Sequence, residues 1–185
     1  MKRLLLTLAA MTLLLTACGQ NKKEMKTLVA YFSATGTTEA VAKDLAEVTG
    51  ATLYEIKPEV KYTAADLNWR DKESRSSVEM QDKNSRPAIV KDLKDADSYD
   101  CIFIGFPVWW GTYPQVMFTL FKDINLDGKT VIPFTTHEGS GLANCVEDVK
   151  EAFPGANVTK GFAIYGHEVR TGKAKVEKWL KTIEL

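Results

Sequence analysis

The stretch that decides the fold is TLVAYFSATGTT, residues 27–38. Its first half, 27–32, is a short apolar run without alternation, which is typical of a strand covered on both faces of a sheet. Its second half, 33–38, is a hydroxyl-rich turn with one glycine, and apolar residues then recur with helical spacing as far as Val48. A buried strand that leads through such a turn into an amphipathic helix predicts the first βα unit of a parallel sheet.

The same alternation continues along the chain. Further strands are predicted at 51–56, 99–106, 129–135 and 157–163. Further helices are predicted at 115–122, 141–153 and 173–185. Strands that alternate with helices predict an α/β fold, a doubly wound three-layer sandwich whose crossovers are right-handed.

Composition narrows the function classes. The chain has 185 residues, 45% of them hydrophobic, with 24 basic and 24 acidic side chains. These values are ordinary for a globular protein and exclude a disordered, collagen-like or polytopic membrane protein. A balanced charge gives no reason to expect nucleic acid. Cys18, Cys101 and Cys145 lack the paired spacing of a zinc site, and we expect the last two to remain reduced thiols.

The N-terminus has the pattern of an export signal. Lys2 and Arg3 precede an apolar run, 4–17, which as a helix would reach only about 21 Å. A bilayer core is about 30 Å thick, so the run is short for a membrane span, and it lacks the polar face of an amphipathic first helix.

Leu15-Thr16-Ala17-Cys18 resembles the bacterial lipobox, in which the cysteine is lipidated. The sequence therefore predicts a lipoprotein signal peptide at 1–17, a tether at 18–25 that starts with lipidated Cys18, and one domain at 26–185.

Residues 57–87 interrupt the strand–helix alternation. This stretch after the second strand is polar, with Tyr62 and Trp69 as its only aromatic residues and three arginines spread through it. A connection this long inside a compact domain is often functional. It could equally be a surface excursion, and the sequence leaves both interpretations open.

Three loops follow strands at the edge where open α/β sheets bind their ligands. The first begins a helix, where free N–H groups suit a phosphate. It offers four hydroxyls and lacks the lysine of an ATP-type loop. Helix capping would account for one hydroxyl, not four. The candidate phosphate-binding residues are Ser33, Ala34, Thr35, Gly36, Thr37 and Thr38.

The second loop is aromatic. Two tryptophans in a loop predict a platform for a flat ligand, and a glycine beside them permits close backbone approach or an unusual φ. One of the two indoles could instead close the edge of the core. The candidates are Pro107, Val108, Trp109, Trp110 and Gly111.

The third loop is rich in glycine and polar groups, as expected of a ligand-facing turn around a sugar-like chain. Its adjacent histidine and glutamate are too few for a metal site, so no metal is expected. The candidates are Thr136, His137, Glu138, Gly139, Ser140 and Gly141.

Together, the order and spacing of these loops resemble the flavodoxin family over about residues 27–183. Ser33-x-Thr35-Gly36-x-Thr38 is similar to the family's FMN phosphate motif, with serine in place of the commoner first threonine. The other two loops resemble a bacterial subfamily that often carries export signals. The resemblance implies a five-stranded sheet of order 2-1-3-4-5, with FMN bound where the strand order reverses. It implies that Trp109 or Trp110 stacks on the isoalloxazine and that backbone near Trp110 and Gly111 meets flavin N5.

The function expected on this basis is that of an FMN-binding electron-transfer protein, exported and lipid-anchored to a bacterial membrane. One alternative is an FMN-dependent NAD(P)H or quinone oxidoreductase, and another is an extracytoplasmic flavin-binding module without a redox role. The expected partner is a redox protein or a membrane electron donor or acceptor. We expect a monomer that meets the membrane only through its lipid. One departure is the balanced charge, since many flavodoxins are strongly acidic.

Overall fold

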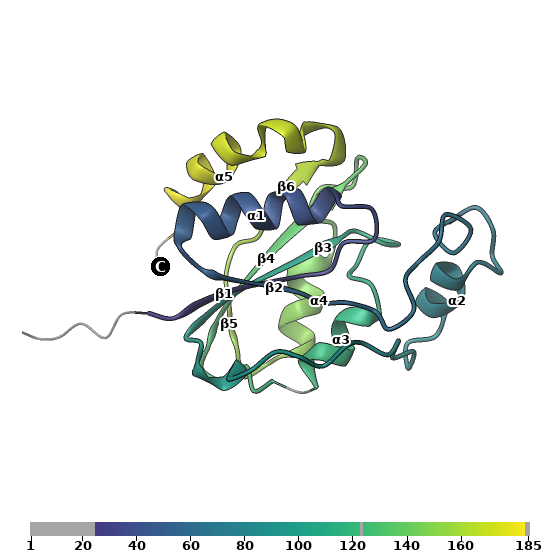
Figure 1. The fold of residues 1–185 in the computed structure, drawn as a ribbon, viewed down its shortest axis with the longest axis horizontal. Coiled ribbons are helices and arrows are strands. Elements are labelled where there is room, and N and C mark those ends of the chain that lie inside the picture. The colour runs from purple at the N-terminus through teal and green to yellow at the C-terminus, as the bar shows by residue number, and fades with distance from the viewer. Residues whose placement is uncertain (1–24, 123, 184–185) are drawn as a thin grey trace, which may run out of the picture.

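A parallel sheet runs through the centre of the molecule, with helices on both of its faces (Figure 1). The computed structural model describes residues 25–122 and 124–183. The sheet order is β2-β1-β3-β4-β5, and β6 also pairs with β4. This order confirms the predicted fold class. The strands are β1 Thr27–Tyr31, β2 Thr52–Glu55, β3 Cys101–Pro107, β4 Thr130–His137, β5 Asn157–Val158 and β6 Phe162–Tyr165.

The outermost strand differs from its prediction. Instead of one strand at 157–163, β5 pairs with the start of β4 and β6 with its end. The Thr159 N–H donates to the Val131 carbonyl at 3.0 Å, so this side of β4 faces the outer strand. Two residues on, Pro133 faces the same way but has no N–H to donate. The ladder is therefore interrupted at Pro133, between β5 and β6.

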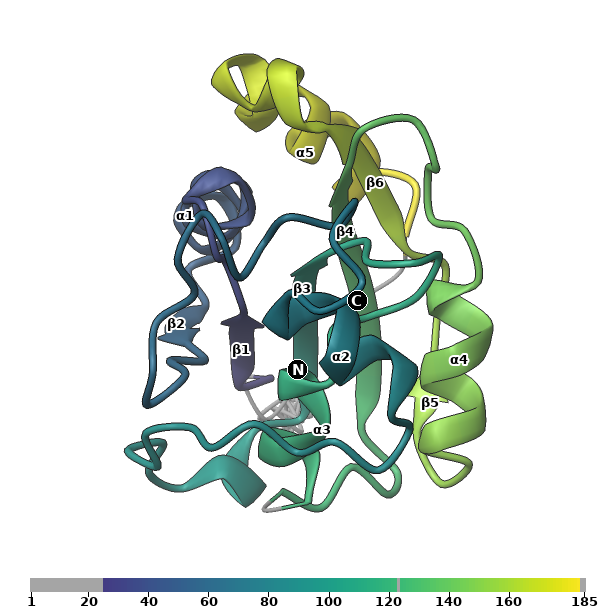
Figure 2. The ribbon, with the colours of Figure 1, turned by 90° about the vertical axis from the view of Figure 1, so that its right-hand side faces the viewer.

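Five helices surround the sheet within the described part of the chain. Figure 1 shows α1 and α5 over one face, α3 and α4 over the other, and α2 beyond the end of the sheet. Figure 2 looks at that end, with α2 in front of the sheet. The helices are α1 Thr37–Thr49, α2 Arg75–Gln81, α3 Val116–Phe121, α4 Cys145–Ala152 and α5 Gly172–Leu180. Two 3₁₀ turns, η1 Ala96–Ser98 and η2 Gly166–Thr171, complete the described elements.

Helix α4 begins later than the predicted residue 141. Gly141 and Ala143 both have positive φ, at 61° and 46°, and such residues do not propagate a right-handed helix. Residues 141–144 therefore form a turn, and the regular helix starts at Cys145.

Each face of the sheet has its own apolar core. Val29, Leu45 and Phe103 are fully buried on the side of α1 and α5. Leu28 and Ile104 are fully buried on the side of α3 and α4. Successive strand residues point to opposite faces, so the continuous apolar runs in the sequence feed both cores.

The two cysteines of the domain are separated by the sheet. Cys101 is buried in the core beneath α1 and α5, and Cys145 in the core beneath α3 and α4. Both are free thiols, as predicted.

The predicted signal peptide at 1–17, the lipidated Cys18 and the tether up to residue 24 lie outside the described residues. Between residues 25 and 183, with residue 123 left aside, no helix has the length and apolar character of a membrane span.

Candidate functional site

A cavity of about 510 Å³ lies at the carboxyl end of the sheet. Its size falls within the range of about 300–1,000 Å³ that is usual for small-molecule and cofactor sites. It collects residues from all three predicted loops and from segments that the sequence did not single out. The lining residues are Ser33, Ala34, Thr35, Thr37, Thr38, Leu67, Trp69, Ser76, Pro107, Val108, Trp109, Trp110, Thr136, His137, Glu138 and Gly166.

The first loop presents an open helix N-terminus to this cavity. Gly36 is the N-cap of α1, with φ 85°, and no side chain caps the helix. The first N–H groups of α1 therefore keep their donor capacity and the partial positive charge of the helix end. None of the loop's hydroxyls caps the helix, so helix capping does not explain why the loop contains four of them.

The hydroxyls of this loop divide into three kinds. Ser33 Oγ is buried with no hydrogen-bond partner in the described part of the chain. Thr35 Oγ1 and Thr37 Oγ1 lie 3.1 Å apart and pair with each other near the surface. Thr38 Oγ1 and Thr136 Oγ1 are buried and lie 2.7 Å apart, which ties the first loop to β4. Ser33 Oγ is thus the hydroxyl for which the protein supplies no partner.

The two tryptophans of the second loop have different environments. Trp109 packs edge-on against Phe32, with ring centroids 5.7 Å apart, and against Tyr62 at 5.4 Å. It closes the edge of the core while still lining the cavity. Trp110 is 53% exposed. The structure thus separates a packed indole from a displayed one.

Trp110 is displayed by a tight turn. Trp109 and Thr112 exchange backbone hydrogen bonds of 2.9 and 3.0 Å, so Trp110 and Gly111 are the two central residues. Both have positive φ, 48° and 83°, which are the signs of a type I′ turn. Glycine adopts this conformation freely, whereas a bulky residue there is an outlier. The unusual φ expected at Gly111 is present, and it extends to Trp110.

The third loop contributes its first half to the cavity. Thr136 and His137, predicted in a loop, end β4, and with Glu138 they line the cavity. His137 Nδ1 accepts the Gly139 N–H at 3.0 Å, which orients the imidazole. Gly139, Ser140 and Gly141 lie in the turn beyond the lining residues. The turn still matters, because the Asn144 N–H donates to the Gly111 carbonyl at 3.1 Å and braces the aromatic loop.

Four lining residues were not predicted: Leu67, Trp69, Ser76 and Gly166. The first three belong to residues 57–87, and the unusual length of that connection was the only feature of the sequence that indicated a functional role for it. Ser76 is the most informative, since it is 2% exposed and its Oγ has no partner among the described residues. The neighbouring buried serines are satisfied, because Ser74 Oγ donates to Ser77 Oγ and Ser77 Oγ to the Asp71 carbonyl.

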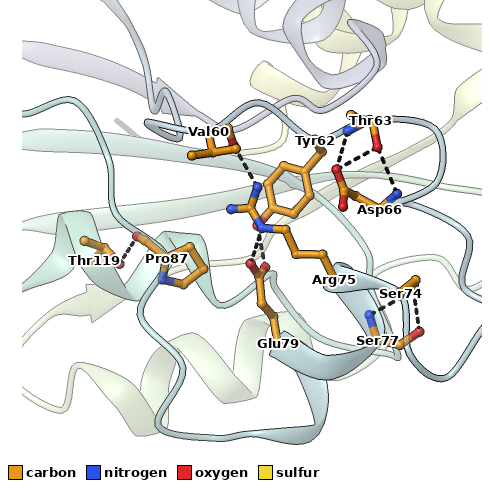
Figure 3. A network of polar contacts seen from close by, with 10 residues as sticks. All are labelled: Val60, Tyr62, Thr63, Asp66, Ser74, Arg75, Ser77, Glu79, Pro87 and Thr119. Carbon is orange, nitrogen blue, oxygen red and sulfur yellow. Dashed lines mark hydrogen bonds and ion pairs between the residues drawn. The ribbon is translucent and has the colours of Figure 1, made fainter.

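A polar network holds 57–87 in place (Figure 3). The Tyr62 hydroxyl donates to Glu79 Oε2 at 2.5 Å, and Arg75 Nε lies 2.7 Å from Glu79 Oε1. The Arg75 guanidinium also lies over the Tyr62 ring, 4.1 Å from its centroid, and donates to the Val60 carbonyl. Burial, and then the bond to Glu79, raise the pKa of Tyr62, so its hydroxyl remains a donor.

The return of this segment to the sheet is anchored on α3. Thr119 Oγ1 donates to the Pro87 carbonyl at 2.8 Å, a contact drawn in Figure 3. Arg86 lies over the Phe118 ring at 4.4 Å and donates to Gln115 Oε1. Both ends of the excursion are thus fixed, which holds Trp69 and Ser76 at the cavity.

The charge of the cavity lining is unusual for a phosphate site. Among the described residues, its lining contains no lysine or arginine, and its one carboxylate, Glu138, is exposed. Any anion would therefore be held by hydroxyls, peptide N–H groups and the end of α1. Within residues 25–122 and 124–183, no three His, Cys, Asp or Glu side chains are grouped to hold a metal ion.

Comparisons with known proteins agree with this geometry. Residues 26–183 match the flavodoxin family. A candidate flavoprotein from Bacteroides eggerthii is 42% identical, with a TM-score of 0.80, over 86% of this chain and 98% of its own. A second candidate flavoprotein, from Bacteroides uniformis, is 48% identical, with a TM-score of 0.77, over 85% and 98% of the two chains.

A more distant relative has been solved with a ligand. A flavoprotein from Lactobacillus acidophilus, crystallised in complex with FMN, is 28% identical. The match has a TM-score of 0.65 and covers 84% of this chain and 99% of that one. The search of curated proteins gave no match.

Proposed function

Since this chain belongs to the flavodoxin family, we propose that it binds FMN in the 510 Å³ cavity and uses it to transfer electrons. One observation carries the proposal. The cavity is bounded by an uncapped helix N-terminus at one side and by the indoles of Trp109 and Trp110 at another, which matches a ligand with a phosphate at one end and a flat ring at the other. The FMN complex of the Lactobacillus acidophilus relative supports the choice of ligand.

The phosphate end of the ligand would lie at the first loop. Ser33 Oγ is a buried hydroxyl without a partner, and a phosphate oxygen would supply the missing acceptor. The N–H groups at the start of α1 and the hydroxyls of Thr35 and Thr37 complete a set of neutral donors. Such a set binds an unreactive phosphate without bringing a cation next to the flavin.

The ring end would lie against the second loop. When bound, FMN supplies the redox chemistry, taking up electrons and a proton at N5. On this chain, the Gly111 carbonyl already accepts the Asn144 N–H, whereas no hydrogen bond among the described residues uses the Trp110 carbonyl. The Trp110 carbonyl is therefore the acceptor available to hold a proton at N5. Trp109 and Val108 line the cavity beside it and limit the access of water.

The proposed location is the outer side of a bacterial membrane, through lipid on Cys18. The support is the lipobox-like Leu15-Thr16-Ala17-Cys18 and the short apolar run before it. Two or more acyl chains give a stable anchor, whereas one is marginal. Fractionation and lipid labelling of Cys18→Ser beside the parent test this part. A parent that carries no label on Cys18, or a variant that stays membrane-bound, would contradict it.

The experiment for the central claim is an absorbance spectrum of the purified chain from residue 19 onward, followed by reductive titration. We expect a yellow protein with one FMN per chain that is reduced and reoxidised reversibly. Tight binding of a different ligand without FMN would overturn the proposal. Bound FMN that cannot be reduced in place would leave a flavin-binding module, and turnover of NADH with a quinone would indicate an oxidoreductase.

A further inference from the structure

We propose that a second site, beside the flavin cavity, binds a planar aromatic anion of the size of a small acidic quinone. The site is a second cavity of about 590 Å³, lined by Trp69, Arg70, Lys72, Ser77, Gln81 and Trp110. This inference rests on the proposed function, because the bound anion would lie next to the flavin.

The two cavities share a wall. Trp69 and Trp110 line both of them, and no other residue that the structure describes does so. A ligand in the second cavity would therefore contact two of the three indoles that border the first. Since one indole comes from 57–87 and the other from the loop after β3, the second site exists only when the excursion is in place.

The indoles of the shared wall are unusually exposed. Trp69 is 64% exposed and Trp110 is 53% exposed. Burying either ring would have been favourable, since a tryptophan buries a large apolar area. The chain instead places Trp110 in a positive-φ turn that suits glycine better. A displayed and strained aromatic residue at the mouth of a cavity points to a ligand that stacks on it.

The charge of the second cavity selects an anion. Arg70 and Lys72 are the only charged residues in its described lining, and neither forms an ion pair with any residue that the structure describes. The Arg70 guanidinium lies over the Trp69 ring, 4.5 Å from its centroid. An aromatic ligand beside Trp69 would therefore lie close to this cation.

The neighbouring polar groups do not engage the Arg70 guanidinium or the Lys72 ammonium in ion pairs. The Glu79 carboxylate is held by Arg75 and Tyr62, and the Asp71 and Glu73 carboxylates form no ion pair with Arg70 or Lys72 among the described residues. Ser77 Oγ donates to the Asp71 carbonyl, and Gln81 Nε2 to the Lys72 carbonyl at 3.3 Å. The cations therefore remain available for the acidic group of a ligand.

The test uses the FMN-loaded protein and anthraquinone-2-sulfonate, with binding measured by equilibrium dialysis under saturating FMN. We expect the probe to bind without displacing FMN, and more weakly as salt rises. Trp110→Ala and Trp69→Ala should each weaken binding by about tenfold, the scale of a lost stacking partner. The double variant Arg70→Gln/Lys72→Gln should weaken it by about fivefold and flatten the salt dependence.

Two controls make the result specific. Lys181→Gln changes an exposed lysine at the end of α5 and should leave probe binding unchanged. 2-(Hydroxymethyl)anthraquinone keeps the ring system without the charge and should bind at least several-fold more weakly than the sulfonate.

The site assignment is overturned if FMN displaces the probe, because the probe then occupies the flavin cavity. It is also overturned if the tryptophan and arginine–lysine variants bind the probe as tightly as the parent, or if the neutral quinone binds equally well. The absorbance of bound FMN is recorded for every variant. A parent protein that takes up no FMN would contradict the proposed function, whereas a parent that is fully loaded with FMN but does not bind the probe would contradict only the second site.

Discussion

The sheet and the excursion at 57–87 are held together by different physics. In β3, residues 101–106 are all buried, and they are apolar side chains or glycine. In the excursion the buried residues are three serines, Ser74, Ser76 and Ser77. Hydrophobic burial scales with area and tolerates many sequences, whereas a buried hydroxyl needs a partner in a particular place.

The difference indicates which region gives this protein its own ligand-binding properties. The sheet provides the edge at which three loops meet, and any chain with the same apolar pattern would provide it. The excursion adds Trp69 and Ser76 to the cavity by means of the network around Tyr62, Arg75 and Glu79. We therefore expect substitutions in the sheet to change the stability of the whole domain. Substitutions in the excursion should change ligand binding at a smaller cost in stability.

The largest effect is expected for Phe103→Ala. The Phe103 side chain is fully buried, and its ring centroid lies 6.0 Å from that of Trp179. Truncation of such a side chain costs about 3–5 kcal/mol of the free energy of unfolding, measurable by chemical denaturation. Val78→Ala in α2 is the matched control, because Val78 is 50% exposed and should cost less than about 0.5 kcal/mol. Similar losses for the two variants would contradict the distinction between the regions.

Glu79→Gln should loosen the excursion without unfolding the sheet. It removes the charge that pairs with Arg75 and accepts the Tyr62 hydroxyl, and the Glu79 side chain is 11% exposed. We expect a loss of about 1–2 kcal/mol, since Arg75 is partly exposed to solvent. Faster amide hydrogen exchange should be confined to 57–87, and FMN affinity should fall.

Tyr62→Phe is the milder partner of this test. It removes one hydroxyl donor and leaves the Arg75–Glu79 ion pair, so a smaller loss of about 0.5–1.5 kcal/mol is expected. Exchange that accelerates across β3 and β4 as well would show that the excursion and the sheet unfold as one unit.

The phosphate interaction separates the cavity from the turn beyond it. Ser33→Ala and Thr35→Ala should weaken FMN by about 1.5–3 kcal/mol, the value of a hydrogen bond to a charged group, and should weaken riboflavin less. Ser140→Ala is the control, since Ser140 lies in the third loop but not among the lining residues. Fluorescence titration with both flavins measures the difference. Equal losses for FMN and riboflavin would mean that these hydroxyls do not hold the phosphate.

The smallest effect is a pH dependence from the core. Burial, and then the nearby Asp148 carboxylate, raise the pKa of Cys145 from 9.0 to about 12. The unfolded chain therefore releases this proton at lower pH than the folded chain does. The associated stability is fully present below pH 9 and declines as pH rises toward 12. Cys145→Ala should make the fall in unfolding free energy over this window shallower, and an unchanged slope would contradict the assignment.

The parts that sequence predicted are those determined locally. Strands such as Cys101–Pro107 were predicted from their continuous apolar runs. The position of each of the three loops after a strand correctly predicted that residues from all three line one cavity. The interruption of the outer strand was not predicted. Pro133 interrupts the ladder only on the side of β4 toward which its N–H would point, and the sequence does not show which strand lies on that side. Trp69 and Ser76 were missed because tertiary hydrogen bonds, not spacing, carry them to the cavity. Gly139–Gly141 were included for their composition, whereas they lie beyond the lining residues, and the bond that braces the aromatic loop comes from Asn144 in the same turn.

The interruption at Pro133 also affects the tendency of this protein to self-associate at high concentration. An exposed sheet edge with a long row of unpaired peptide groups can recruit another chain as an added strand. Here one edge is formed by β5 and β6, of two and four residues, and the opposite edge by β2, of four residues. Neither edge offers a template long enough for stable strand addition. We therefore expect the folded domain to resist fibrillar self-association at high concentration, and a proline in the strand next to the edge to be part of the reason.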